Sequence, residues 1–168
     1  MPSFGAEFSC VQRPIIEYVT EQVIGWTHVP REEAEERRGG LAGLFFYDTL
    51  GQKLLDLNRD IDLDVELAGQ IMQQMQGVRA SIEGNRDILN YLRGAKTVYH
   101  PTKKRNLNIT LIDFDHPENN IFEVTDEWSH TSGRITNRAD LVFLINGIPV
   151  VVVETKAAHK DDAIEIGM

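Results

Sequence analysis

The chain has 168 residues, 42% of them hydrophobic and 26% charged, a composition that is ordinary for one soluble globular domain. Its net charge of −9 argues against broad nonspecific binding of nucleic acid by a basic surface, although it leaves room for a local basic patch. One cysteine excludes an internal disulfide, and neither a signal peptide nor an apolar run of membrane-spanning length is present. We therefore predict a cytoplasmic protein without a membrane partner.

The first half of the sequence predicts helices. Apolar residues recur at helical spacing over 9–25, with Pro14 suited to the first turn and Gly25 to the end. The charge run 31–38 is typical of a solvated helix face or loop. Residues 53–93 read as mostly helical, which gives a predicted helical layer over about 9–94.

The pattern changes to strands after residue 95. Short apolar or β-branched runs predict strands at 95–100, 107–114, 120–125, 140–145 and 148–156. The fold class is therefore α/β (α+β), with helices followed by a mostly antiparallel sheet over about 95–157. We expect one domain over 1–168, and residues 158–168 read as the start of a helix that is cut off, as in a fragment of a longer protein.

Charged residues stand at the ends of the two apolar runs that flank Asn146-Gly147. Asp140 opens the first run, and Glu154 and Lys156 close the second. Charges that follow a buried strand are costly unless they have partners or a ligand. Two carboxylates at one strand end suit a hard cation such as Mg²⁺, and a nearby lysine suits a metal-bound water and phosphate charge. The alternative is a set of solvated strand-end charges.

The turn between the runs decides whether the two carboxylates share a face. A two-residue turn would set Asp140 opposite Val153, on the face away from Glu154. A three-residue loop would set Asp140 opposite Val152, on the face of Glu154. The metal site therefore requires a longer loop, a bulge, or an Asp140 just beyond the regular strand.

Several segments resemble the N-terminal nuclease region of the restriction (R) subunit of type I restriction-modification enzymes. They are LRGAKTVYHPTKKRN, LNITLIDFDHPENNIFEVTDEW and above all NRADLVFLINGIPVVVVETKAA, with VQRPIIEYVTEQVIGW more loosely. The resemblance covers most of the chain and is weakest over 27–80.

The resemblance implies the PD-(D/E)xK restriction-endonuclease-like fold, a central mixed sheet flanked by helices. Asp140 and Glu154 match the metal-binding carboxylates, for Mg²⁺ or Mn²⁺ as a substitute, and Lys156 matches the catalytic lysine. The Thr155 carbonyl matches a frequent backbone ligand. Ala139 stands where the motif has proline, and the family's Gln-x-x-x-Tyr helix lies beyond this chain. Glu17 is a candidate for the acid that such nucleases often carry on the first helix.

The implied function is Mg²⁺-dependent hydrolysis of DNA phosphodiester bonds without intrinsic sequence specificity. The implied partners are double-stranded DNA and the modification and specificity subunits. The sequence lacks a P-loop, so ATP would be bound only by translocase domains outside this chain. The alternatives are another PD-(D/E)xK repair or junction nuclease, and a catalytically silent DNA-binding or assembly module.

Basic residues gather at two places. Lys103, Lys104 and Arg105 precede a predicted strand, and Arg134 and Arg138 precede the Asp140 run. They are compatible either with a path for DNA or with solvated loops.

Overall fold

The computed structural model describes residues 8–79 and 81–156. The helix predicted at 158–168 lies outside these residues. The chain divides into two compact units. The sheet unit comprises Met1–Leu44, Phe122–Ile145 and Pro149–Met168, and the helical unit comprises Phe45–Ile121 and Asn146–Ile148.

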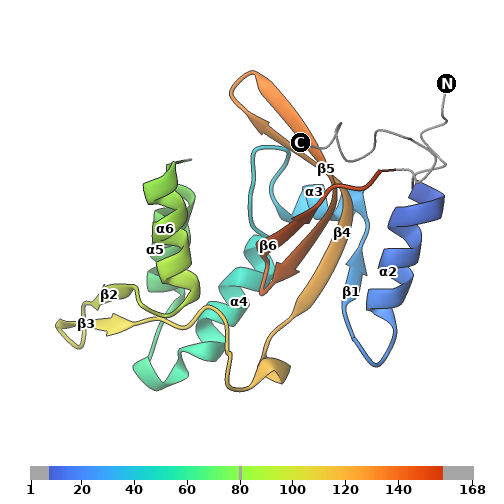
Figure 1. Ribbon diagram of the computed structural model, residues 1–168. Coiled ribbons are helices and arrows are strands. Elements are labelled where there is room, and N and C mark those ends of the chain that lie inside the picture. The colour runs from blue at the N-terminus through green and yellow to red at the C-terminus, as the bar shows by residue number, and fades with distance from the viewer. Residues whose placement is uncertain (1–7, 80, 157–168) are drawn as a thin grey trace. The chain divides into compact units, whose positions relative to one another are not determined.

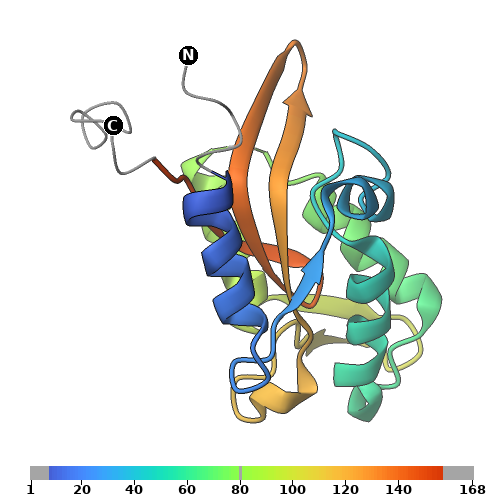
Figure 2. The ribbon, with the colours of Figure 1, turned by 90° about the vertical axis from the view of Figure 1, so that its right-hand side faces the viewer.

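The sheet unit is built on four strands, β1 (Thr27–Val29), β4 (Phe122–Ser132), β5 (Ile135–Ile145) and β6 (Ile148–Val153), in the order β1-β4-β5-β6 (Figure 1). β1 runs parallel to β4, and β4 runs antiparallel to β5. This is the mixed sheet with flanking helices that was predicted. β4 and β5 are longer than predicted and form a ribbon that projects past the other strands (Figure 2).

Helices cover both faces of this sheet. A short π-helix, η1 (Phe8–Gln12), leads into α2 (Arg13–Thr20), and α3 (Arg31–Arg37) lies on the opposite face from α2 (Figure 2). Pro14 occupies the first turn of α2, as predicted. The helix ends at Thr20 rather than Gly25. Val23, one of the apolar residues within 9–25 whose helical spacing predicted the longer helix, is 96% exposed. The charge run forms α3, which buries Ala34.

Apolar side chains fill both faces of the central strands. Trp26 packs against the rings of Phe122 and Phe143 at centroid distances of 5.2 and 5.0 Å. The alternating positions Thr125, Val142 and Leu144 are also buried, and α3 packs against β4, the strand that carries Thr125. Burial on both faces explains why Leu141 to Ile145 reads as a continuous apolar run.

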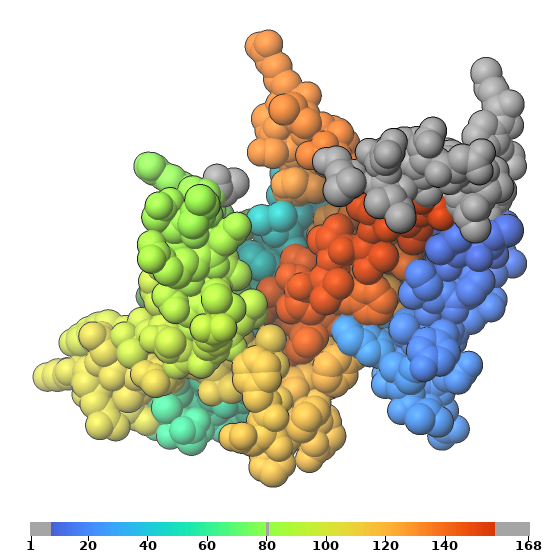
Figure 3. Space-filling view, viewed as in Figure 1, coloured from blue at the N-terminus to red at the C-terminus, as the bar shows by residue number. Residues whose placement is uncertain are grey.

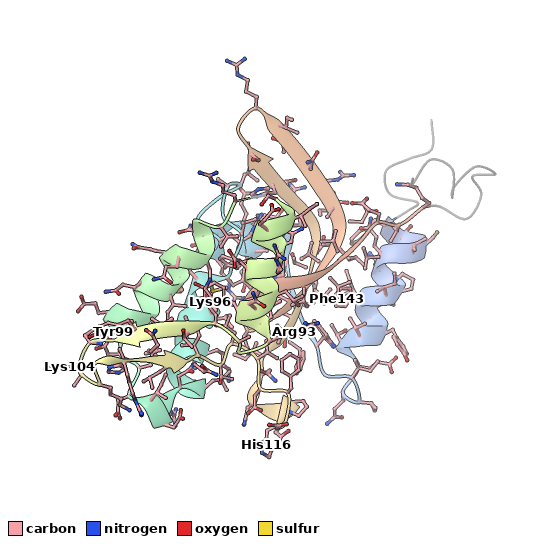
Figure 4. The ribbon with its side chains drawn as sticks, turned by 60° about the vertical axis from the view of Figure 1, so that its left-hand side comes forward. Arg93, Lys96, Tyr99, Lys104, His116 and Phe143 are labelled. Carbon is pink, nitrogen blue, oxygen red and sulfur yellow. The ribbon has the colours of Figure 1, made fainter. Side chains whose placement is uncertain are left out.

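The helical unit contains α4 (Tyr47–Leu57), α5 (Val65–Gln76) and α6 (Ile82–Leu92), with short 3₁₀ turns η2 (Arg59–Ile61) and η3 (Pro117–Asn119). The predicted helices are confirmed. Asp64 and Ser81 cap α5 and α6 by accepting the amides of Leu67 and Gly84, and each lies where its sequence pattern places a helix start. β2 (Thr97–His100) and β3 (Arg105–Asn108) form a separate two-stranded sheet instead of joining the larger one. Figure 4 shows Tyr99 and Lys104 on this hairpin.

The strand predicted at 107–114 is wrong beyond Asn108. β3 ends at Asn108, and the chain that follows is irregular. The carboxylate of Asp113 accepts the amide of His116 at 2.9 Å and the side chain of Asn119 at 2.8 Å. Such local bonds of an aspartate compete with a strand ladder. Hydrogen bonds also lower the pKa of Asp113, led by the Asn119 side chain.

Candidate active site

The Asn146-Gly147 turn is the two-residue type. Both residues have positive φ, 53° and 76°, which is the signature of a type I′ hairpin turn. Asn146 is held by its buried side chain, which accepts the Ile121 amide and donates to the Leu111 carbonyl, each at 2.8 Å. By the hairpin rule, this turn sets Asp140 opposite Val153. A longer loop, one of the routes by which Asp140 could reach the face of Glu154, is therefore excluded.

Asp140 is buried, 7% exposed, and its carboxylate is fixed by the end of β6. Its Oδ2 atom accepts the Thr155 amide at 2.6 Å and the Thr155 hydroxyl at 2.9 Å. β6 ends at Val153, so the Thr155 amide is free of the strand ladder and available to this carboxylate. Thr155 therefore joins the candidate site through its amide and side chain, whereas sequence reasoning had considered only its carbonyl.

Glu154 and Lys156 lie on the same short segment but in different surroundings. Glu154 is exposed and Lys156 is half-buried, and neither forms a hydrogen bond or ion pair with another described residue. Glu154 lines a shallow cavity of about 320 Å³ in the sheet unit. The other residues that line this cavity include Leu44, Trp128, His130, Arg138 and Val152. β6, which contributes Val152, reaches the surface of its unit (Figure 3).

The two carboxylates suit a cation in number and kind. Oδ2 of Asp140 is used by Thr155, which leaves its other oxygen, and Glu154 presents a carboxylate without a protein partner among the described residues. Mg²⁺ takes one or two protein carboxylates and keeps waters, so two suffice. Within residues 8–79 and 81–156, no three His, Cys, Asp or Glu side chains are grouped to hold a metal ion. The donor set therefore fits a hydrated cation better than a full protein cage.

An irregularity in β4 lies directly opposite Asp140. Strand pairing joins Asp126 to Leu141 and Trp128 to Ala139, but skips Glu127 and Asp140. Glu127 has φ 52°, a left-handed backbone that is unfavourable for a glutamate by about 1 kcal/mol. Its carboxylate is nearly buried and forms an ion pair with Arg138 at 2.8 Å, without well-aligned hydrogen-bond geometry. Sequence reasoning missed Glu127, because no pattern marks a single left-handed residue inside a strand.

Burial raises the pKa of Glu127 above its ordinary value of 4.5, and the neighbouring carboxylate of Asp140 raises it further, while Arg138 opposes both. As the pH rises above 4.5, Glu127 holds its proton longer in the folded state than in the unfolded state. The free energy of unfolding that Glu127 contributes therefore falls as the pH rises from 4.5 through the raised pKa.

The substitution Glu127→Gln should remove this loss of stability with rising pH. Urea unfolding at about pH 4 and about pH 7 should show the variant gaining stability relative to the wild type at the higher pH. An unchanged or reversed difference would contradict the raised pKa.

Of the remaining predicted residues in the sheet unit, Arg138 lines the cavity beside Glu154, whereas Glu17 and Arg134 are not among the residues that line it. Glu17 is exposed on α2 and makes no hydrogen bond or ion pair with another described residue. Arg134 lies in the turn between β4 and β5 of the sheet unit, whereas Lys103, Lys104 and Arg105 belong to the helical unit. Lys103 pairs with Asp62 at 3.0 Å. A basic path for DNA that joins the two groups stays a prediction.

The first helix contributes Gln12 to the neighbourhood of Asp140 instead of Glu17. Gln12 is 3% exposed, and its side-chain nitrogen lies 3.4 Å from the Thr155 hydroxyl. The burial of Gln12 could have been predicted from the sequence. Gln12 precedes the buried Ile16 by four residues and therefore lies on the apolar face of the helix. A glutamine on that face needs a polar partner inside the protein.

Comparison with known proteins agrees with the resemblance of the motifs. The family model described as "Type I restriction enzyme R protein N terminus" matches residues 6–166. This chain belongs to that family. It is also similar to the type I restriction enzyme HindI endonuclease subunit of Haemophilus influenzae, with 24% identity over 150 residues. That match covers 84% of this chain and 14% of the relative, so the chain spans about a seventh of the relative's length.

The region that matches the family model includes Asp140, Glu154 and Lys156. The family match covers both units, including the helices of 27–80, where the motifs were weakest. None of the helices in the described residues is long and apolar enough to cross a membrane.

Proposed function

We propose that this domain of the restriction-subunit family is a Mg²⁺-dependent DNA endonuclease that hydrolyses phosphodiester bonds without sequence specificity of its own. The observation that carries the proposal is the buried carboxylate of Asp140, held by Thr155, the residue between Glu154 and Lys156 in the sequence. A buried aspartate that is fixed by two donors on one oxygen is a preorganised ligand, because its free oxygen has one direction. The family match supports the same reading.

In this proposal Asp140 and Glu154 would hold Mg²⁺. The bound ion would supply a more acidic water and would neutralise phosphate charge. Lys156 would position the attacking water and would stabilise the negative charge that develops on the phosphate. Thr155 would keep Asp140 in one rotamer by donating its amide and hydroxyl to Oδ2. Mn²⁺ would replace Mg²⁺, because it accepts the same oxygen ligands.

The proposed partners are double-stranded DNA and the modification and specificity subunits of a type I complex, in the cytoplasm. DNA recognition would come from the specificity subunit, and ATP would act only through translocase domains outside this chain. The assignment to a type I site-specific deoxyribonuclease is part of this proposal. Since the chain is short compared with its relative, these partners concern the longer protein.

A catalytically silent DNA-binding or assembly module is the second candidate. Glu154 is exposed and makes no hydrogen bond with another described residue, and the tight turn sets Asp140 opposite Val153. Those two observations favour strand-end charges with a structural role only. The module would bind no divalent ion at this hairpin.

The rates at which the wild type and Lys156→Met nick plasmid DNA separate the two candidate functions. The variant should keep its Mn²⁺ affinity, since lysine is no ligand, but should lose about 100-fold in the rate of nicking supercoiled plasmid with Mg²⁺, because the developing charge is no longer stabilised. Lys53→Met on α4 removes the same charge from the helical unit and should nick at the wild-type rate. Equal nicking by Lys156→Met and the wild type would contradict the role of Lys156. Absence of metal-dependent nicking in the wild type would favour the silent module.

A further inference from the structure

Gln12 is a buried residue with only one of the two polar atoms of its side-chain amide hydrogen-bonded among the described residues. It closes η1 at the start of α2 and is 3% exposed. Its nitrogen donates to the Thr155 hydroxyl at 3.4 Å. Its oxygen, Oε1, is buried without a hydrogen-bond donor in the part of the chain that the structure describes. Buried polar atoms are nearly always paired, so this oxygen requires an explanation.

The direction of the amide follows from the chain of donors. A threonine hydroxyl has one proton, and the Thr155 hydroxyl lies 2.9 Å from Oδ2 of Asp140, an acceptor only. The hydroxyl therefore donates to Asp140 and must accept from Gln12. Only the nitrogen of Gln12 can donate, so the amide cannot be reversed, and Oε1 is the atom left over.

The atom left over is an acceptor on a side chain that is joined to the candidate cation site by a chain of two hydrogen bonds. Gln12 is joined through Thr155 to Asp140, whose other oxygen is available to a metal. Mg²⁺ keeps several of its waters when it binds carboxylates, and these waters are strong donors. Groups that accept from the hydration shell and orient the ligands tune metal affinity about 10- to 100-fold.

We propose that Gln12 is a positioning residue of this site. Its nitrogen fixes the Thr155 hydroxyl as a donor to Asp140, and its oxygen accepts a hydrogen bond from a water of the hydrated cation. The inference rests on the proposed metal-dependent function. In this proposal the first helix supplies the site with the neutral amide of Gln12, in place of the carboxylate expected at Glu17.

The test compares Mn²⁺ affinity by titration calorimetry in the 168-residue chain and four variants, one of which is Asp140→Ala. Gln12→Met keeps the volume and removes both polar atoms, and it should bind Mn²⁺ about 10-fold or more weakly. Gln12→Glu keeps an acceptor of the same length but replaces the donor nitrogen by a second acceptor, so it tests the Oε1 role alone and should bind more tightly than Gln12→Met. Gln22→Met, at an exposed glutamine, is the matched control and should bind like the wild type. Thermal melts of each protein report whether it folds.

The outcomes separate this inference from the proposed function. A folded Gln12→Met with wild-type affinity, or a Gln12→Glu as weak as Gln12→Met, would overturn the role of Gln12. Either result, combined with loss of binding in Asp140→Ala, would leave the proposed metal site standing. If Gln12→Met fails to fold, Gln12→Glu decides: Mn²⁺ binding less than about 10-fold weaker than that of the wild type supports the role of Gln12, and weaker binding overturns it. A wild type that binds no Mn²⁺ would overturn both proposals.

Discussion

Replacing Asp140 by asparagine is expected to abolish DNA cleavage with little effect on the fold. Asparagine has the same shape, and its carbonyl oxygen can still accept the amide and hydroxyl of Thr155. It lacks the negative charge that a hard divalent cation requires. We expect a loss of at least about 100-fold in the rate of plasmid nicking with Mg²⁺, and a melting temperature within about 2 °C of the wild type.

The matched control for this substitution is Asp87→Asn. Asp87 is an exposed aspartate on α6 that pairs only loosely with Lys96, at 3.6 Å. This variant should nick at the wild-type rate. Should Asp140→Asn keep a rate within about threefold of the wild type, the chemistry would have to lie elsewhere in the molecule.

Replacing Arg38 by methionine is expected to be the most destabilising change in the sheet unit. Arg38 is 3% exposed and donates to the carbonyls of Ala34, Gly43 and Ser129 at 3.1–3.2 Å. Its guanidinium also lies 3.7 Å from the centre of the Trp128 ring. Burial lowers the pKa of Arg38, because it removes part of the water around the charge.

Methionine fills part of the same space but leaves buried carbonyls without a donor. We expect a loss of about 3 kcal/mol in the free energy of unfolding, or roughly 6–12 °C in melting temperature. The chain has two tryptophans, Trp26 and Trp128, and both lie in the sheet unit, so their fluorescence follows this unit. Lysine at this position should rescue little, since it lacks the planar fork of donors.

The control for Arg38 is Arg134→Met, because Arg134 lies exposed in the turn between β4 and β5. It should melt within about 1 °C of the wild type. A melting temperature for Arg38→Met that is equally close to the wild type would show that the three carbonyls find water instead. Trp128 lines the cavity beside Glu154, so loss of Arg38 should also disturb that side of the candidate site.

Apolar periodicity and capping residues in the sequence correctly predicted the helices and strands whose formation depends on neighbouring residues. The apolar periodicity of α5 and α6, and the caps Asp64 and Ser81, marked two helices correctly. The apolar hairpin of β5 and β6 also followed from its sequence. β1 was not predicted, because a strand of three residues carries no periodicity and is fixed by its parallel pairing with β4. The segment 109–121 depends on long-range bonds, such as Asn58 to the amide of Thr110, that no local pattern contains.

The candidate site was predictable as a set of residues more than as a geometry. The motif gives Asp140, Glu154 and Lys156, and the structure adds a hydrogen bond from the Thr155 amide to Asp140, where Thr155 stands between Glu154 and Lys156 in the sequence. The bonds that do this are made after β6 ends, where the strand alternation on which the register argument relied no longer applies. Gln12 and Glu127 come from distant parts of the chain, so only the folded structure places them beside Thr155 and Arg138.

The central claim is that Asp140 is a ligand for a divalent cation, and Mn²⁺ titration calorimetry tests it most directly. The wild-type chain should bind Mn²⁺, and Asp140→Ala should show no binding at millimolar Mn²⁺ while it keeps a cooperative melt. Equal binding by both proteins, or no binding by the wild type, would contradict the account and leave the charges of this hairpin with a structural role alone.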